Sequence, residues 1–233
     1  MSEFQQIREQ AYKANMQLTR LNLVMFTFGN VSVLDPHRNV FAIKPSGVAY
    51  DELHADKMVI VDLEGNVIEG TLRPSSDTLT HAVLYKHWKG IGSIVHTHST
   101  YATAWAQAQR DIPVFGTTHA DHLTVDIPCA APMNDDMIAG NYELETGYQI
   151  INCFKDRQLD PLEVQMMLVG NHAPFAWGAN SEKAVYHAAV LEEIARMAWL
   201  TESIHPNAPR LKEALIKKHY QRKHGPDAYY GNS

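Results

Sequence analysis

Short apolar runs bounded by turn-forming residues recur along the chain, mostly in its first half, and predict β-strands. The predicted strands cover residues 23–28, 31–34, 40–43, 58–62, 67–69, 93–95, 114–118 and 164–169. Residues 35–39 and 64–66 lie between successive runs and are rich in Asp, Asn, Pro and Gly, which favour tight turns. Two hairpins are therefore predicted, one across each of these turns.

Longer stretches with apolar residues three or four positions apart predict helices. The predicted helices cover residues 3–19, 100–109, 142–155, 182–203 and 211–224, with a further helix that opens at 74–77 and runs to Trp88. Strands dominate the first half and helices the last third, so we predict a mixed α/β layer fold. The strands and helices do not alternate regularly, which argues against a doubly wound parallel sheet.

Composition narrows the class of protein. No linker rich in Pro, Gly or Ser divides the 233 residues, so we predict one domain, 1–233. The formal net charge is -6, which argues against a nucleic-acid partner. The N-terminus lacks the apolar core of a signal peptide, and no apolar run reaches the ~20 residues of a membrane span. A cytoplasmic protein with no membrane partner is expected, and its two cysteines are too few for a disulfide framework.

Two histidines, His96 and His98, follow the predicted strand Ser-Ile-Val at 93–95. Residues i and i+2 of a strand point to the same face, so His96 and His98 are predicted to converge on one point. Imidazole is a common ligand of zinc and similar divalent ions. The alternative is a pair of hydrogen-bonded histidines at a strand end, and further ligands are needed to favour the metal.

His172 and Asp77 are the best candidates for those further ligands. His172 follows the apolar run 164–169, much as His98 follows its own strand. Asp77 lies in the first turn of a predicted helix, where backbone N–H groups are expected to hold one oxygen and leave the other for a metal. Taken singly, Asp77 could be a plain helix cap and His172 a core histidine. Together, three histidines and one carboxylate make a plausible metal set.

Other common catalytic motifs are missing from the sequence. It contains no Gly-x-Gly-x-x-Gly, no Walker motif and no nucleophile elbow, so nothing indicates a nicotinamide, flavin or P-loop site.

Seven segments, in order, carry a resemblance that spans nearly the whole chain. They are 29–32 (Gly-Asn-Val-Ser), 44–47 (Lys-Pro-Ser-Gly), 74–78 (Pro-Ser-Ser-Asp-Thr), 95–99 (Val-His-Thr-His-Ser), 116–121 (Gly-Thr-Thr-His-Ala-Asp), 172–178 (His-Ala-Pro-Phe-Ala-Trp-Gly) and the C-terminal stretch 218–231. In these segments the chain resembles the class II aldolase-like family, and within it the sugar-phosphate 4-epimerases. The resemblance implies a single-domain α/β fold with a mostly antiparallel central sheet flanked by helices.

The same resemblance implies an activity and a set of site residues. The activity is the metal-dependent interconversion of L-ribulose 5-phosphate and D-xylulose 5-phosphate, in arabinose or ascorbate breakdown. The implied ligands of zinc, with manganese or cobalt as substitutes, are Asp77, His96, His98 and His172. The implied acid/base pair is Asp121 and Tyr230. The implied substrate-binding residues are Gly29, Asn30, Lys44, Ser46, Gly47, Ser75, Ser76, Thr117, Glu143 and His219. A homotetramer is also implied, with Tyr230 and His219 reaching a neighbour's site.

Two alternatives remain at this point. The first is a metal aldolase that releases its two products, such as one acting on fuculose 1-phosphate. In aldolases of this family the residue at the Asp77 position is typically glutamate, so aspartate favours the epimerase. The second is a non-enzymatic interaction module like the adducin head, which lacks the metal ligands that this chain retains.

Overall fold

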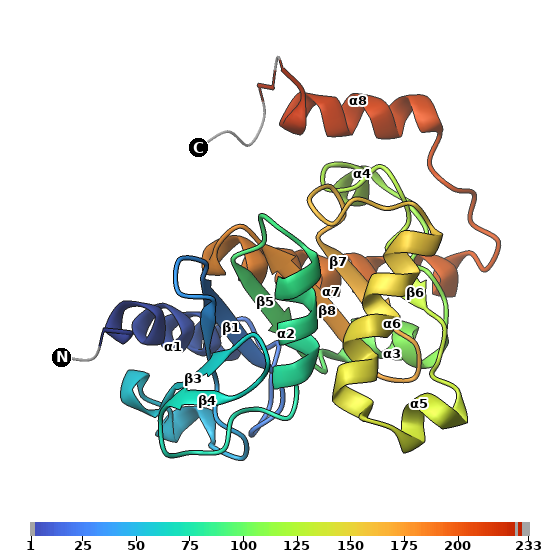
Figure 1. Ribbon diagram of the computed structural model, residues 1–233. Coiled ribbons are helices and arrows are strands. Elements are labelled where there is room, and N and C mark those ends of the chain that lie inside the picture. Colours follow the sequence, from blue (N-terminus) through green and yellow to red (C-terminus); the bar gives the residue numbers. More distant parts are fainter. Residues whose placement is uncertain (1–2, 227, 230–233) are drawn as a thin grey trace.

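A single eight-stranded sheet forms the centre of the molecule. The computed structural model describes residues 3–226, 228 and 229 (Figure 1). The strands are β1 (Asn30–Asp35), β2 (Val40–Ile43), β3 (Val59–Asp62), β4 (Val67–Glu69), β5 (Ser93–His96), β6 (Cys129–Ala130), β7 (Met166–Val169) and β8 (Pro174–Gly178). Their order is β4-β3-β2-β1-β5-β8-β7-β6. Only β6 and β7 pair in parallel among the described strands, so the predicted mostly antiparallel sheet is confirmed.

Helices cover both faces of this sheet (Figure 1). They are α1 (Gln5–Arg20), α2 (Thr78–His87), α3 (Thr100–Gln107), α4 (Thr117–Ala120), α5 (Asp135–Ala139), α6 (Tyr142–Asp156), α7 (Ser181–Ile204) and α8 (Glu213–His224). Two short 3-10 turns, Tyr50–Glu52 and Ala55–Lys57, link β2 to β3. On β1, Val33 packs with residues of α1, whereas Ser32 faces His81 and Tyr85 of α2. Helices α1, α3 and α7 therefore cover one face, and α2 and α6 cover the other. None of the described helices is both long enough and apolar enough to span a membrane.

An aromatic cluster fixes α2 and α6 against the sheet. The ring of Trp88, just after α2, lies 4.7 Å from Trp177 of β8 and 4.9 Å from Phe154 of α6. All three side chains are buried. Burying a large apolar side chain contributes roughly 1.5–3 kcal/mol, so this cluster fixes the C-terminal end of α2 against the sheet.

The central strands bring residues from distant parts of the sequence together. In the β1–β5 pair Asn30 lies opposite His96, and in the β5–β8 pair His96 lies opposite Phe175. The end of β5 is therefore flanked on both sides by hydrogen-bonded strands, so its terminal side chain is held rigidly.

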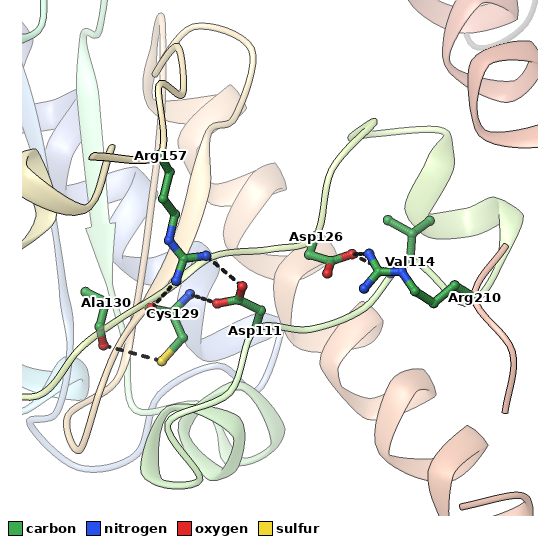
Figure 2. Close-up of polar contacts among 7 residues, drawn as sticks. All are labelled: Asp111, Val114, Asp126, Cys129, Ala130, Arg157 and Arg210. Carbon is green, nitrogen blue, oxygen red and sulfur yellow. Dashed lines mark hydrogen bonds and ion pairs between the residues drawn. The ribbon is translucent and has the colours of Figure 1, made fainter. Parts of the chain in front are cut away.

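Two predicted strands are wrong. Residues 23–28 form turns, with Phe26 at a φ of 54°. Phe26 and Phe28 are 77% and 55% exposed, so their apolar pattern does not mark a buried strand. Residues 114–118 are an extended connection that enters α4, and Figure 2 shows Val114 beside the Asp126–Arg210 ion pair. There the Val114 N–H bonds to the Asp126 carboxylate rather than to a neighbouring strand.

The C-terminal helix α8 stands apart from the sheet (Figure 1). None of its residues is buried, and the helix packs against the short helix α4. An amphipathic helix normally buries a face against its own core, which α8 does not do.

Candidate metal and active site

Three histidines meet at the end of the central strands. His96 is the last residue of β5, His98 lies two residues further along the loop before α3, and His172 lies in the turn between β7 and β8. The Nε2 atoms of His96 and His98 are 3.2 Å apart, and one ligand nitrogen from each of the three residues falls within 4.8 Å of the others. The predicted convergence is confirmed, although the strand itself ends at His96.

The protonation of these rings suits a metal. The Pro174 carbonyl oxygen lies 3.1 Å from His96 Nδ1 and can only accept, so Nδ1 carries the hydrogen and the Nε2 lone pair faces His98. Burial, with a further contribution from His96, lowers the pKa of His172 to about 3 and also lowers the pKa of His98. Metal coordination requires neutral imidazoles, and two nitrogens 3.2 Å apart need a shared proton or a cation between them.

Asp77 lines the same cavity but is held differently from the prediction. Its side chain accepts no hydrogen bond from the N–H groups of α2, so that expectation is wrong. Instead its Oδ2 accepts from Asn30 Nδ2 at 2.6 Å and from Ser75 Oγ at 3.4 Å. Burial acts to raise the pKa of Asp77, but the neighbouring His96 and His81 and the Asn30 hydrogen bond outweigh it and lower the pKa. The 4.8 Å group comprises the histidines alone, so ligation by Asp77 stays a prediction.

Two glycine-containing turns and the segment before α2 line the cavity together with the histidines. The cavity holds about 430 Å³. Its lining includes Gly29, Asn30, Lys44, Ser46, Gly47, Ser75, Ser76, Asp77, Tyr142 and Glu143 together with the three histidines. Gly29 and Gly47 have φ values of 74° and 71°, which strain any other residue. The Ser46 N–H donates to Arg73 O and the Ser75 N–H to Lys44 O, so the loop at 44–47 lies beside the segment before α2. Such turns expose N–H groups and hydroxyls that can hold an anion.

Lys44 links the loops around the cavity. Its ammonium donates to Val48 O at 2.6 Å and lies 3.4 Å from both Thr27 O and Pro45 O. The side chain is only 2% exposed, and burial lowers its pKa to about 8. In this arrangement the lysine holds two loops together, and direct contact with a substrate anion stays a prediction.

Tyr142 is a lining residue that the sequence did not single out. It is the first residue of α6, its ring centroid lies 6.0 Å from that of His172, and the side chain is 39% exposed. Its neighbour Glu143 accepts a hydrogen bond from Thr80 through its backbone oxygen, which ties the start of α6 to α2. The helix start predicted at Tyr142 was the one sequence signal that could have drawn attention to it.

The remaining predicted residues form a second group, between α4 and α8. Asp121 accepts from His219 Nδ1 at 2.9 Å and from Arg222 Nη2 at 3.0 Å, and its own N–H bonds to Thr117 O. Burial acts to raise the pKa of Asp121, but Arg222 and His219 outweigh it, so the pKa is lowered. None of Thr117, Asp121 and His219 lines the cavity. Tyr230 lies outside the described residues.

Comparisons with known proteins agree with this architecture. The family model for the Class II Aldolase and Adducin N-terminal domain matches residues 9–199. The chain is 49% identical over 227 residues to L-ribulose-5-phosphate 4-epimerase UlaF of Salmonella paratyphi A, covering 97% of this chain and 99% of the relative. The protein of the same name from Salmonella typhi gives the same values.

Two solved structures share the fold at low sequence identity. An L-fuculose 1-phosphate aldolase has a TM-score of 0.77 at 23% identity, covering 95% of this chain and 97% of the other. The enzyme of that name from Glaciozyma antarctica PI12 has a TM-score of 0.77 at 17% identity, covering 97% of this chain and 84% of the other. The sheet order, the histidine cavity and these matches agree, and the chain belongs to the class II aldolase and adducin family.

Proposed function

We propose that the protein is an L-ribulose-5-phosphate 4-epimerase that interconverts this sugar with D-xylulose 5-phosphate. The observation that carries the proposal is the 49% identity to the UlaF epimerases over 97% of the chain. A cavity that joins three converging histidines to glycine-containing turns supports it. We also propose a single domain that acts in the cytoplasm.

The chemistry follows from the position of the carbon that is inverted. The hydrogen on C4 is two bonds from the ketone and is not acidic, so simple deprotonation cannot invert that carbon. Retro-aldol cleavage of C3–C4, rotation of the released aldehyde and re-addition to its other face can do so. As the bond breaks, the 4-hydroxyl gives up its proton and the bonding electrons pass toward the C2 carbonyl. After rotation the bond re-forms and the 4-hydroxyl regains a proton.

A divalent metal would be held by His96, His98 and His172, with Asp77 as the proposed fourth ligand. Zinc suits such a set, and manganese or cobalt are substitutes with the same ligands. When bound, the ion supplies a Lewis acid that stabilises the negative charge developing on the substrate.

The loops keep the detached aldehyde in place. We propose that its phosphate binds to the turns at residues 29–30, 46–47 and 75–76, because these turns line the cavity and turns of this kind can hold an anion through hydroxyls and backbone N–H groups. A bound phosphate lets the aldehyde rotate without leaving, and this separates an epimerase from an aldolase.

Proton transfer needs groups on both sides of C4, and we propose Asp121 and Tyr230 for this role. Asp121 and His219 form a cluster separate from the cavity, at the protruding helix α8. A homotetramer in which the cluster of one chain completes the cavity of another accounts for this separation.

A turnover assay with L-ribulose 5-phosphate tests the proposal. Coupled detection should find D-xylulose 5-phosphate as the main product, with little free dihydroxyacetone or glycolaldehyde phosphate. Release of those two fragments as the main products would instead identify an aldolase, and turnover of neither kind by metal-loaded protein would favour the interaction module.

A further inference from the structure

A buried polar chain runs behind the metal cavity, between α2 and the sheet. Tyr85 Oη lies 2.7 Å from Ser32 Oγ, which in turn lies 2.7 Å from His81 Nδ1. Ser32 and His81 are 0% exposed and Tyr85 is 2% exposed. Burying polar groups at a helix–sheet interface is unfavourable compared with apolar packing, so we expect these three residues to have a specific role.

The hydrogen bonds fix where the protons lie. Ser32 is the one hydrogen-bond acceptor described for the Tyr85 hydroxyl, so Tyr85 donates to Ser32. Ser32 has one proton of its own and donates it to His81 Nδ1. Burial lowers the pKa of His81 to about 3, so the ring is neutral. Its hydrogen therefore lies on Nε2, which is buried and has no hydrogen-bond partner among the described residues.

This histidine lies directly behind Asp77. Asn30 and Ser32 occupy positions i and i+2 of β1 and face the same way, and Asp77 and His81 are one helical turn apart. Two hydrogen bonds therefore connect β1 to the start of α2, one above the other: Asn30 to Asp77 at 2.6 Å, and Ser32 to His81 at 2.7 Å.

Helix geometry and ring packing place the His81 side chain beside the metal cavity. The His81 backbone N–H donates to the Asp77 backbone oxygen at 3.0 Å, so the two residues lie one helical turn apart at the start of α2. The His96 ring stacks on Phe175 at 4.3 Å, and the His81 ring meets the same Phe175 edge-on at 6.3 Å.

We propose that His81 is a positioning residue for Asp77, fixed through Ser32 and Tyr85 so that its Nε2–H supports the carboxylate. Outer partners of metal ligands hold those ligands in the orientation that the ion requires, and their loss typically weakens metal binding 10–100-fold. The inference rests on the proposed metal site and adds a residue that does not line the cavity.

Two substitutions of the same histidine separate positioning from simple packing. The amide of His81→Asn occupies the Nδ1 position and keeps a partner for Ser32, but it removes the donor at Nε2. The amide of His81→Gln is one carbon further out and keeps a donor near Nε2. We expect zinc affinity, measured by competition with a chromophoric chelator, to fall about 10–100-fold in His81→Asn. His81→Gln should stay near the wild-type value, although both variants lose thermal stability.

The outcomes distinguish the inference from the metal assignment. Equal weakening in both variants, or wild-type affinity in both, would overturn the role of His81 and leave the metal site intact. Wild-type protein without zinc affinity would overturn the site itself. An NMR spectrum of protein with ¹⁵N-labelled histidine, assigned with the His81→Asn variant, gives a second readout. The Nε2–H tautomer is expected for His81, and an Nδ1–H or doubly protonated ring contradicts the proposal.

Discussion

The cavity and the α4–α8 cluster differ in how the fold supports them. The cavity lies at the end of β5, which is paired on both sides, and its ligand histidines come from strand ends and a tight turn. The cluster joins Asp121 at the end of a four-residue helix to His219 and Arg222 of a helix with no buried residue. The fold therefore builds the proposed metal half of the site into its core and leaves the proposed acid/base half at the surface.

That difference predicts how far each half of the site depends on assembly of the chains. A cavity held by β-ladders should bind metal in an isolated chain, because its three histidines already converge. A cluster on an exposed helix is free to meet a second chain, and its role in catalysis should depend on assembly. The predictions below test each half, beginning with the largest effect.

Removing a cavity histidine should abolish metal binding. His98→Ala takes away one of three converging nitrogens, so zinc affinity should fall by more than about 100-fold, beyond the usual effect of losing an outer partner. Metal content after dialysis and turnover should fall together. The control is His37→Ala, because His37 is exposed in the β1–β2 turn. Full metal content in His98→Ala protein would rule out this site.

Removing the carboxylate of the cluster should stop proton transfer and leave the metal in place. Asp121→Asn should lower kcat about 10²–10⁴-fold with unchanged metal content. Asp126→Asn is the matched control, since Asp126 lies close in sequence and pairs with Arg210 (Figure 2). It should lose stability but retain most of kcat. An Asp121→Asn enzyme with normal kcat would remove Asp121 from the mechanism.

Weakening the anion-binding wall should affect binding more than chemistry. Ser76→Ala should raise KM for L-ribulose 5-phosphate about 10-fold at nearly constant kcat, because a hydrogen bond to the phosphate exists in ground and transition states alike. Ser203→Ala, at the exposed end of α7, is the control. Equal activity of the wild-type enzyme on free L-ribulose would contradict phosphate binding at these loops.

The buried histidines and the Asp121 ion pair should also differ in their response to acid. The folded-state pKa values of the buried His81 and His119 are about 3 and about 4, below the unfolded value of 6.5. The unfolded chain then binds more protons, so stability is full above pH 6.5 and falls as the pH drops toward these values. Asp121, with a lowered pKa, keeps its ion pair until the pH falls below the usual aspartate range.

Thermal unfolding of chelator-treated protein checks this order. Tm should already fall between pH 7 and 5, by about 2–4 °C for each kcal/mol lost. His119→Asn should flatten the curve in that range, whereas Asp121→Asn should change it only at lower pH. A Tm that is constant from pH 7 to 5 would contradict neutral buried histidines.

The sequence predicted those parts of the fold that local patterns determine. β2 (Val40–Ile43) and β4 (Val67–Glu69) have the predicted bounds, because turn residues flank each run. β8 (Pro174–Gly178) was missed, because it is buried on both faces and so lacks the alternation of apolar and polar residues that marks a half-buried strand. The segment that contains the exposed Phe26 and Phe28 was wrongly predicted as a strand, because periodicity alone does not reveal burial.

The candidate site was predicted by residue type but not by its contacts. The convergence of His96 and His98 follows from strand geometry and needed no other part of the chain. The Asn30–Asp77 hydrogen bond and the Asp121–Arg222 pair join residues 47 and 101 positions apart, so they depend on the packed fold. For the same reason a local pattern suggested that α2 would hold Asp77, whereas β1 does so.

The most direct test of the two-part site is complementation between its halves. His98→Ala chains lack a working cavity, and Asp121→Asn chains lack a working cluster. Each protein alone should be inactive. The two are mixed in equal amounts, dissociated and reassembled, with hybrid formation verified by mass spectrometry. If each site combines the cavity of one chain with the cluster of another, about one quarter of the sites in a random hybrid are intact, and activity should return to that level. Verified hybrids without activity would show that one chain supplies both halves, and would contradict the account.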